Sequence, residues 1–433
     1  MVALVLTLIV SIQGIAAASP GAAESGLSSV DRAVIAQMLK DMAEAVHKDY
    51  YDPTLGGVDF KAAYSAAQAS IAKANSVHEG YEAVANLMRS LNDSHTVFIP
   101  PQQPFTIDPG FSMQFIGDKC YVTRVKRGSD AEAKGLTPGD EITMVDGVKP
   151  TRENWDDMNY TINVLAPRSS LHLLVASPKQ EPRALTIQSV LKQRRKNFDL
   201  TGVDVTNFLH QEDADLEKNK SYEATVGDVQ VLKLHSFEYK EDAMDSWVHK
   251  AQGHKALILD LRGNPGGSED LLLRMLGDVF DHGVQVAQPV GRNKPKPLIV
   301  KPASHPYSGK LIVLVDSDSA SCSELFARVV QLEKRGTIIG DRTAGAVRRA
   351  NIKTFVHGQG TVFAYAIEVT VADLKMGDGK SLERVGVTPD EILLPTPQQL
   401  AAGEDPQLAR AMELAGEPIS SKKAGKIFPA PEL

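Results

Sequence analysis

The amino-acid sequence predicts an α/β core, a helical N-terminal region and an inserted β-rich module. After residue 226, continuous apolar runs such as "ALILDL" and "KLIVLV" alternate with helical segments, a pattern typical of strands buried on both faces. Residues 111–190 show short alternating runs separated by glycine-containing turns, which predict a small β-rich module. Apolar side chains at helical spacing fill residues 28–92 and predict helices there.

The chain of 433 residues, with 42% apolar and 23% charged side chains, has ordinary globular composition and room for two or three domains. The patterns along it define six segments. These are a signal peptide (1–23), the helical region (28–100), the β-rich module (101–190), a linker with an exposed hairpin (191–225), the α/β core (226–400), and a closing helix with a tail (401–433).

The first 23 residues resemble a secretory signal peptide. An apolar stretch is followed by small residues, with cleavage expected between Ala16 and Ala23, and the apolar run is short for a membrane span. The usual positive charge at the start is missing, so an uncleaved N-terminus that keeps the chain near a membrane remains an alternative. We expect an exported protein, periplasmic or secreted.

Composition excludes several classes of function. A net charge of −7 without a long basic run gives no sign of nucleic-acid binding. The two cysteines, Cys120 and Cys322, form no C-x-x-C pair, which argues against zinc ribbons and redox dithiols. We expect them to be free buried thiols. The sequence implies no metal and no organic cofactor, and it leaves the oligomeric state open.

In the helical region, apolar residues from Val30 to Val46 recur at helical spacing, and "YYDP" (Tyr50 to Pro53) ends that helix. A second helical pattern runs from Glu79 to Leu91. The proline-containing segment 100–110 predicts a domain boundary. In the core, helices are expected around 241–251, 269–279 and 322–334, between strands that include "DVQVLKL", "GTIIG" and "TVFAYAIEVTVA".

Loops that follow the core strands carry the residues suited to chemistry. "LDLRGNPGG" (259–267) ends in glycines whose backbone N–H groups could cradle an anion, although a tight turn explains them equally well. In "DSDSASCSELF" (316–326), Ser321 and Cys322 lie where a strand gives way to a helix, so Ser321 is a candidate nucleophile. The alternative is that all four serines, Ser317, Ser319, Ser321 and Ser323, are turn and N-cap residues.

A serine nucleophile also needs a base. The turn "GDRTAGAVRRA" (340–350) contains no lysine, and its arginines are too basic for the role. Among the eleven histidines, His95 in "LNDSHT" stands out because it ends a helical segment beside an extended one. A purely structural histidine is the alternative.

Four motifs in series resemble those of the C-terminal-processing (tail-specific) serine peptidase family, whose distant relatives include the tricorn protease and the retinoid-binding proteins of the eye. They are "ALILDLRGNPGG", "VDSDSASCSELFA", "GDRTAGA" and "LERVGVTPDE". The segment "GSDAEAKGLTPGDEITMVDGV" looks like the PDZ domain of the same proteins. The resemblance covers residues 30 to 415 and implies a ClpP/crotonase-like protease core with an inserted PDZ-like domain.

The resemblance also implies roles for single residues. Ser321 matches the family nucleophile. The backbone N–H groups of Cys322 and Gly266, with Gly267 as the alternative, match the oxyanion hole. The sequence departs from the family at Ala346, which occupies the position of the catalytic lysine, so the usual Ser–Lys mechanism is excluded.

The sequence instead resembles the tricorn-like branch of the family, which uses a catalytic tetrad. The matching residues here are Ser321, His95, Ser94 and Glu383. In that arrangement His95 is the general base, Glu383 holds the imidazole and stabilises its charged form, and Ser94 helps to orient it.

The PDZ resemblance implies capture of a substrate C-terminus at a loop formed by Gly110, Phe111, Ser112 and Met113. A PDZ domain that only covers the core is the alternative. The function implied is an exported serine endopeptidase acting on proteins or peptides. A non-catalytic protein that binds peptides or apolar ligands on the same scaffold, and a hydrolase of small esters, are the competing hypotheses.

Overall fold

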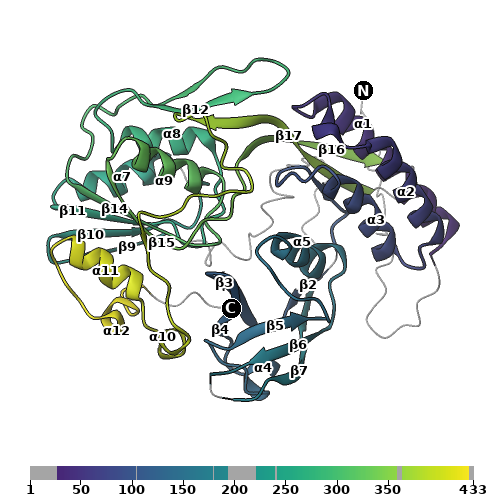
Figure 1. Cartoon of the computed structure of the whole chain (residues 1–433), viewed down its shortest axis with the longest axis horizontal. Coiled ribbons are helices and arrows are strands. Elements are labelled where there is room, and N and C mark those ends of the chain that lie inside the picture. The colour runs from purple at the N-terminus through teal and green to yellow at the C-terminus, as the bar shows by residue number, and fades with distance from the viewer. Residues whose placement is uncertain are drawn as a thin grey trace, which may run out of the picture.

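The computed structural model describes residues 27–103, 105–178, 180–193, 221–238, 241–357 and 363–428. The expected signal peptide and most of the expected linker lie outside these residues. Figure 1 shows an α/β core, a helical region at the N-terminus and a separate β-rich domain. The predicted fold class is therefore confirmed. No helix in the described ranges is long and apolar enough to cross a bilayer.

Three helices form the N-terminal region: α1 (Ser29–Asp49), α2 (Phe60–Lys73) and α3 (Val77–Arg89). The side chains of Ser28, Asp59 and Ser76 cap their first turns by accepting backbone N–H groups. A short 3₁₀ turn, Leu55–Gly57, separates α1 from α2. The helical patterns from Val30 to Val46 and from Glu79 to Leu91 correspond to α1 and α3, whereas no separate boundaries were predicted for α2.

The β-rich domain is a five-stranded antiparallel sheet in the order β3-β4-β5-β6-β7. Its strands are β3 (Phe111–Ile116), β4 (Lys119–Val125), β5 (Glu141–Val145), β6 (Ser170–Ala176) and β7 (Arg183–Gln188). The short helix α4 (Asp130–Ala133) and the helix α5 (Trp155–Tyr160), continued by a π-helical turn (Thr161–Leu165), cover it. Within the described residues β3 pairs only with β4, so it is an edge strand.

The connection between this domain and the core differs from the prediction in two places. Segment 100–110 contains strand β2 (Phe105–Asp108), which pairs with β8 (Val190–Gln193) in a two-stranded ribbon. The end of the expected linker is strand β9 (Tyr222–Val226), which forms a hairpin with β10 (Val229–Lys233) in the core sheet. Strands β2 and β9 are short and mix polar with apolar residues, so they lack the continuous apolar runs that mark the core strands.

The core sheet has six strands in the order β18-β15-β14-β11-β10-β9 and is parallel except for β9. The strands not yet named are β11 (Ala256–Asp260), β14 (Lys310–Val315), β15 (Gly336–Gly340) and β18 (Glu391–Ile392). Helices α7 (Glu241–Ala251), α8 (Glu269–Gly277) and α9 (Cys322–Leu332) pack on one face. On the other face lie α11 (Pro406–Leu414) and α12 (Ser421–Ala424), as Figure 1 shows. The apolar runs are thus buried on both sides, as their pattern predicts.

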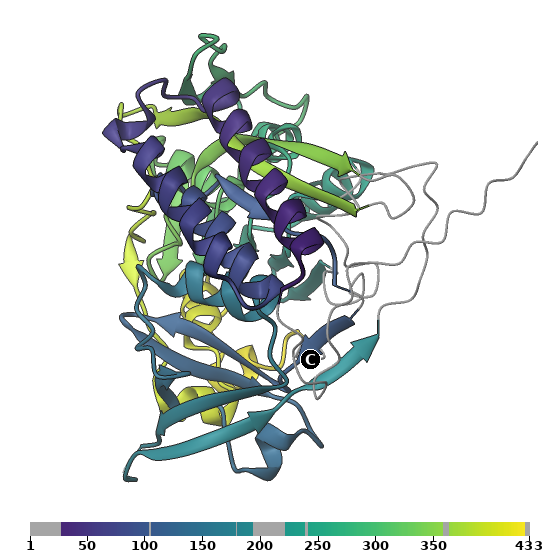
Figure 2. The same ribbon diagram turned by 90° about the vertical axis from the view of Figure 1, so that its right-hand side faces the viewer.

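A second sheet links the core to the helical region. It is built on a long hairpin of β16 (Arg348–His357) and β17 (Phe363–Met376), joined by β1 (Val97–Ile99), β12 (Gln285–Val290) and β13 (Leu298–Ile299). Figure 2 shows helices α1 to α3 lying across this hairpin. Phe98 of β1 and Tyr365 of β17 are fully buried beneath the helices. The predicted strand at 361–372 is confirmed as β17, whereas the polar strand β16 was not predicted.

The C-terminal segment contains α10 (Pro397–Ala402), α11 and α12, where one helix was expected. A buried ion-pair cluster fixes it to the core. Arg262 contacts Asp260 and Asp405, each at 2.7 Å, and Asp260 is fully buried. Burial raises the pKa of Asp260, but Arg262 and Lys233 lower it more, so the net pKa lies below its usual value.

We predict that Arg262→Met lowers the free energy of unfolding of the core by about 3 kcal/mol, because it leaves a buried carboxylate without its main partner. Urea denaturation at pH 7 measures the change. The stabilisation exists at neutral pH and is lost as the pH falls below about 4, since the folded pKa of Asp260 is depressed. The half-buried ion pair of Arg410 with Glu391, whose side chains are 34% and 36% exposed, serves as the control. Arg410→Met should change stability much less, and an equal loss for both variants would contradict the prediction.

Candidate active site

Ser321 lies at the start of α9, directly after the loop that follows β14. Its backbone has φ 53° and ψ −116°, a conformation that a residue with a Cβ atom rarely adopts. Its N–H group donates to the Ala346 carbonyl at 2.9 Å and to the Glu324 carboxylate at 3.1 Å. These contacts hold a strained backbone at the helix N-terminus, a conformation associated with functional positions.

The other three serines of this loop bond to backbone carbonyls. Ser317 donates to Phe115 at 2.7 Å, Ser319 to Leu261 at 2.8 Å, and Ser323 to Asn264 at 3.0 Å. Ser319 and Ser323 are fully buried. They are therefore structural residues, which leaves Ser321 as the candidate nucleophile of the loop.

The glycine loop after β11 lies against Ser321. A Cβ atom added to Gly266, which has φ 105°, would lie 2.6 Å from the Cβ of Ser321 and 3.0 Å from the nitrogen of Cys322. Only a glycine permits this approach. The N–H of Gly266, however, donates to the Asn264 side chain at 2.9 Å. Among the described residues, the N–H groups of Gly267 and Cys322 have no acceptor, so the geometry favours the alternative donor, Gly267, over Gly266.

The cysteines are free and buried in the described structure, as expected. Burial raises the pKa of the Cys322 thiol to about 12, so it remains protonated at neutral pH. The thiol donates to the Gly267 carbonyl at 3.2 Å. Cys322 thus contributes a backbone N–H near Ser321, and its side chain helps to fix the glycine loop.

The structure brings Ser94, His95 and Glu383 together in a chain of hydrogen bonds. The Ser94 hydroxyl donates to one oxygen of Glu383 at 2.8 Å and lies 2.7 Å from Nδ1 of His95. The Ser94 N–H donates to the other oxygen of Glu383 at 2.9 Å. Since the hydroxyl gives its proton to the carboxylate, Nδ1 must carry the proton of the imidazole. Nε2 is then the basic nitrogen.

The expected contact of Glu383 with the imidazole is indirect. In the described structure, the Ser94 hydroxyl lies between the Glu383 carboxylate and the His95 ring. Two successive residues, Ala346 and Val347, connect this chain of hydrogen bonds to Ser321. The Val347 N–H donates to Glu383 at 3.0 Å, and the Ala346 carbonyl accepts from the N–H of Ser321. The turn that lacks the lysine therefore contacts both halves of the site.

The environment of His95 keeps the imidazole neutral. Burial lowers the pKa of His95, Glu383 and Asp93 raise it, and Arg348 and Arg384 lower it, with a net pKa below the ordinary value. Asp93 also fixes the backbone, because its carboxylate accepts the N–H of His95 at 2.9 Å. Thr370 and Tyr50 donate to the same carboxylate at 2.6 Å and 3.0 Å.

Glu324 was not predicted as a site residue. Its fully buried carboxylate accepts four hydrogen bonds, from the N–H groups of Ser321, Gly345 and Ala346 and from the hydroxyl of Thr343. Burial raises the pKa of Glu324 and these hydrogen bonds lower it, and the net pKa is about 7. The carboxylate therefore joins the nucleophile to the 343–346 turn. The sequence contains a signal for this contact. A serine followed three residues later by a glutamate, as in Ser321 and Glu324, is the capping-box pattern of a helix N-terminus.

Of the expected carboxylate-binding residues, Gly110 directly precedes the edge strand β3, and Phe111, Ser112 and Met113 begin it. The N–H of Gly110 already donates to Asp108 at 2.9 Å, so it is not available to a peptide carboxylate. Two lysines, Lys126 at 2.6 Å and Lys192 at 2.8 Å, neutralise Asp108. The structure thus places the four residues at one sheet edge, with the glycine N–H engaged internally.

The other end of β3 contacts the nucleophile loop. Ser317 donates to the Phe115 carbonyl, and the Gln114 amide donates to Asp316 at 2.7 Å. Beyond the strand, Asp341 accepts the Gly117 N–H at 2.8 Å and pairs with Arg152 at 2.6 Å. The edge of the β-rich domain therefore leads directly to the loop that carries Ser321.

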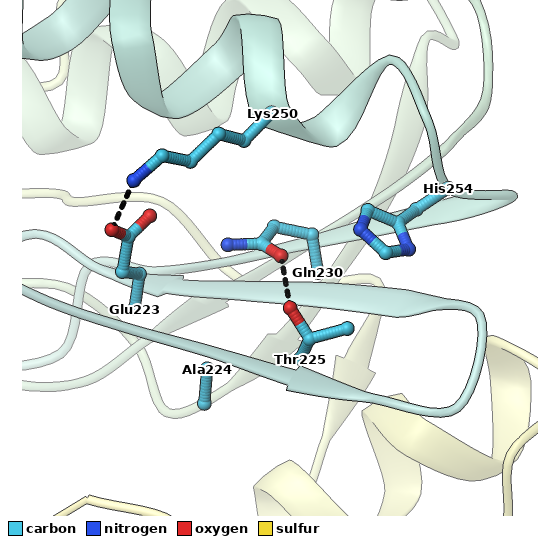
Figure 3. A pocket seen from close by; sticks show the side chains of 6 residues that line it. All are labelled: Glu223, Ala224, Thr225, Gln230, Lys250 and His254. Carbon is cyan, nitrogen blue, oxygen red and sulfur yellow. Dashed lines mark hydrogen bonds and ion pairs between the residues drawn. The ribbon is translucent and has the colours of Figure 1, made fainter.

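A polar hollow lies elsewhere, between the β9–β10 hairpin and α7 (Figure 3). It contains a Lys250–Glu223 ion pair at 2.5 Å and a hydrogen bond from Thr225 to Gln230 at 2.8 Å. None of the predicted site residues lines it. Within the described ranges, no three histidine, cysteine or acidic side chains are arranged to hold a metal ion.

Comparison with protein families gives two matches. Residues 228–393 match the model of peptidase family S41, and residues 105–176 match the PDZ domain. The chain is 23% identical to the carboxyl-terminal-processing protease of Synechocystis sp., covering 81% of this chain and 80% of the relative. It is 24% identical to the carboxy-terminal processing protease CtpA of Bacillus subtilis, over 71% of this chain and 62% of that protein.

Solved structures support the fold. Mature CPAF in complex with lactacystin is 15% identical and aligns with a TM-score of 0.63, over 86% of this chain and 96% of that chain. The mutant of CPAF with a serine replaced by alanine aligns with a TM-score of 0.65, at 15% identity, over 86% and 95% of the two chains. At this identity the likeness concerns the arrangement of the elements.

We predict that Glu324→Gln lowers the free energy of unfolding by about 2 kcal/mol, because an amide has one acceptor oxygen where the carboxylate has two. Loss of the bond to the Ser321 N–H should also slow the reaction of Ser321 with a fluorophosphonate by at least about tenfold. Thermal unfolding and labelling rates measure the two effects. Glu333→Gln, at the exposed end of the same helix, is the control. Labelling of Glu324→Gln at the unaltered rate would contradict the role of this carboxylate.

Proposed function

Because this chain belongs to peptidase family S41, is a serine-type peptidase and carries a PDZ domain, we propose that it is an exported endopeptidase with Ser321 as nucleophile and His95 as base. Its substrates are proteins or peptides. The single observation that carries the mechanistic part is the hydrogen-bonded chain Glu383–Ser94–His95, connected to Ser321 through the turn at Ala346 and Val347.

The chemistry follows from this geometry. Nε2 of neutral His95 removes the proton of Ser321 as its oxygen attacks the scissile carbonyl. The N–H group of Cys322, at the N-terminus of α9, and the N–H group of Gly267, in the loop after β11, stabilise the oxyanion that forms. The imidazolium then protonates the leaving amine. Water hydrolyses the acyl-enzyme with the same base, so the protonation states return to their starting point.

Ser94 and Glu383 orient the imidazole of His95 and stabilise its charged form, two tasks that do not arise when a lysine is the base. When His95 becomes charged, its Nδ1–H donates to the Ser94 hydroxyl, which in turn donates to the Glu383 carboxylate. The negative charge therefore stabilises the imidazolium through one intervening hydroxyl. The same chain fixes the orientation of the ring, which is the principal task of the acidic residue in a serine–histidine–acid mechanism.

The edge strand β3 offers a route for the substrate. A peptide that adds antiparallel to β3, with its C-terminus at Phe111 to Met113, extends its upstream residues toward Phe115 and Ile116. That end of the strand contacts Asp316 and Ser317 of the nucleophile loop. Capture of a C-terminus would thus direct upstream peptide bonds toward Ser321. Lys126, which pairs with Asp108, supplies positive charge at the carboxylate end.

Export is proposed from the apolar stretch and small residues within 1–23. N-terminal sequencing of the protein recovered from its native compartment tests it. A mature N-terminus after Ala16 to Ala23 supports export by cleavage, whereas an intact leader on a membrane-bound protein supports the uncleaved anchor.

We predict that a fluorophosphonate labels Ser321 stoichiometrically, and that His95→Ala reduces the labelling rate by about 10²-fold or more, because the general base is lost. Ser321→Ala should abolish both labelling and cleavage of an unfolded protein substrate. Intact-mass and peptide mapping identify the labelled residue. His172→Ala in the PDZ domain is a matched histidine control, since its ring contacts only Thr186 among the described polar groups. Absence of labelling and cleavage in the unaltered protein would favour a non-catalytic binding protein.

We predict that amidation of a substrate's C-terminus lowers kcat/KM by about tenfold, since a neutral amide loses the attraction of the charged carboxylate-binding end of β3. Paired peptides with a free or amidated C-terminus, and otherwise identical sequence, measure this. The rate of fluorophosphonate labelling is the control. That probe has no peptide C-terminus, so the enzyme samples used with the two peptides should be labelled at the same rate. Equal kcat/KM values for the two peptides would reject C-terminal capture.

A further inference from the structure

Arg348, the first residue of β16, is a buried cation beside the candidate base. Its Nη1 lies 3.6 Å from Asp93 and its Nε lies 3.7 Å from Glu383, and the side chain is 13% exposed. The guanidinium packs over the ring of Tyr51, 4.5 Å from the ring centre. Neither Nε nor Nη1 has a hydrogen-bond partner among the described residues, so the two carboxylates act on these atoms through charge.

The two carboxylates hold the catalytic segment from opposite ends. Asp93 accepts the backbone N–H of His95, and Glu383 accepts both the N–H and the hydroxyl of Ser94. They are like charges in a largely buried region, 6% and 8% exposed as whole residues. Without a cation between them they would repel each other, and both would favour protonation of the imidazole.

We propose that Arg348 is a positioning residue, which holds the Asp93 and Glu383 side chains in place so that His95 stays neutral and correctly oriented. This inference rests on the proposed role of His95 as general base. Arg348 does not touch the reacting atoms. It acts through the two carboxylates and the backbone they fix.

The charged groups around His95 come from three elements. Asp93 precedes it in its own loop, Glu383 and Arg384 belong to the loop after β17, and Arg348 begins β16. Two further groups act through Asp93: Tyr50 donates to it, and Glu368 of β17 lies near it with a pKa raised by burial and by Asp93 to about 7. Loss of Arg348 therefore removes a cation and leaves two carboxylates facing the ring. The pKa of His95 must then rise.

Arg384 provides a matched control. Its Nε lies 3.6 Å from the same Glu383 oxygen, nearly the distance of Arg348, but its side chain is 40% exposed. The described structure shows no contact between Arg384 and Asp93. Solvent and salt screen such an exposed pair. Arg348→Met and Arg384→Met thus each remove one positive charge near Glu383, the first from a buried site and the second from an exposed site.

The experiment measures the pKa of His95 by NMR titration of its imidazole, identified by comparison with the spectrum of His95→Gln. We expect Arg348→Met to raise the pKa of His95 by about one unit. Arg384→Met should raise it by less. The effect of Arg384→Met should disappear in 0.5 M salt, where the screening length is only a few ångströms. The acid limb of fluorophosphonate labelling should move by the same amount, and the maximal rate in Arg348→Met should fall by about tenfold. Arg348→Lys, which keeps the charge without the planar fork, should show a smaller pKa rise and partial recovery of the rate.

Two results would overturn the proposal. One is an unchanged pKa of His95 in a folded Arg348→Met protein, even if its thermal midpoint falls. The other is an equal shift in Arg348→Met and Arg384→Met. The proposed function is tested separately by whether labelling of Ser321 depends on His95. If that dependence is missing while the NMR pKa rises only in Arg348→Met, the base assignment fails and the electrostatic role of Arg348 stands.

Discussion

The rest of the site depends on the hydrogen bonds that the Glu324 carboxylate accepts. This carboxylate is fully buried, and it accepts hydrogen bonds from the nucleophile residue and from three residues of the 343–346 turn. Ser321 can keep its strained φ of 53° because its N–H is bound on both sides, to Glu324 and to Ala346. The next residue of the turn, Val347, then binds Glu383 and so reaches the histidine half. One buried carboxylate thus sets the spacing between the two halves.

The sequence predicted the residue types of the site better than their connections. Motif order was sufficient to single out Ser94, His95, Ser321 and Glu383, because each lies in a short recognisable loop. Which group contacts which could not be predicted, since the order along the chain does not reveal that Ser94 lies between Glu383 and His95. The order of preference between Gly266 and Gly267 as oxyanion donors could not be judged from the motif for a similar reason. The Gly266 N–H is engaged by Asn264, a side chain two residues away that the motif alone did not interpret.

Fold prediction worked where burial shapes the sequence and failed where it does not. The strands β11 and β14 are buried on both faces, so their apolar runs are unmistakable. Strand β16 alternates arginine, asparagine and lysine with a few apolar residues and is mostly half-buried or exposed, so it gave no such signal. From the sequence, Arg348 was therefore considered only as a possible base in a turn, and it was excluded because arginine is too basic. Its importance depends on the pairing of β16 with β17, which brings it between Asp93 and Glu383.

The hydrogen bond between Ser94 and Glu383 spans 289 positions of the chain. The ribosome makes the histidine segment early, the nucleophile much later, and the glutamate later still. Until Glu383 has emerged, neither the ring orientation nor the charge balance around His95 can be established. On the proposed mechanism, a nascent chain that lacks Glu383 has Ser321 without an oriented base, so it could not yet cleave itself or its neighbours. The long sequence separation would then tie the onset of activity to the folding of the last core segments.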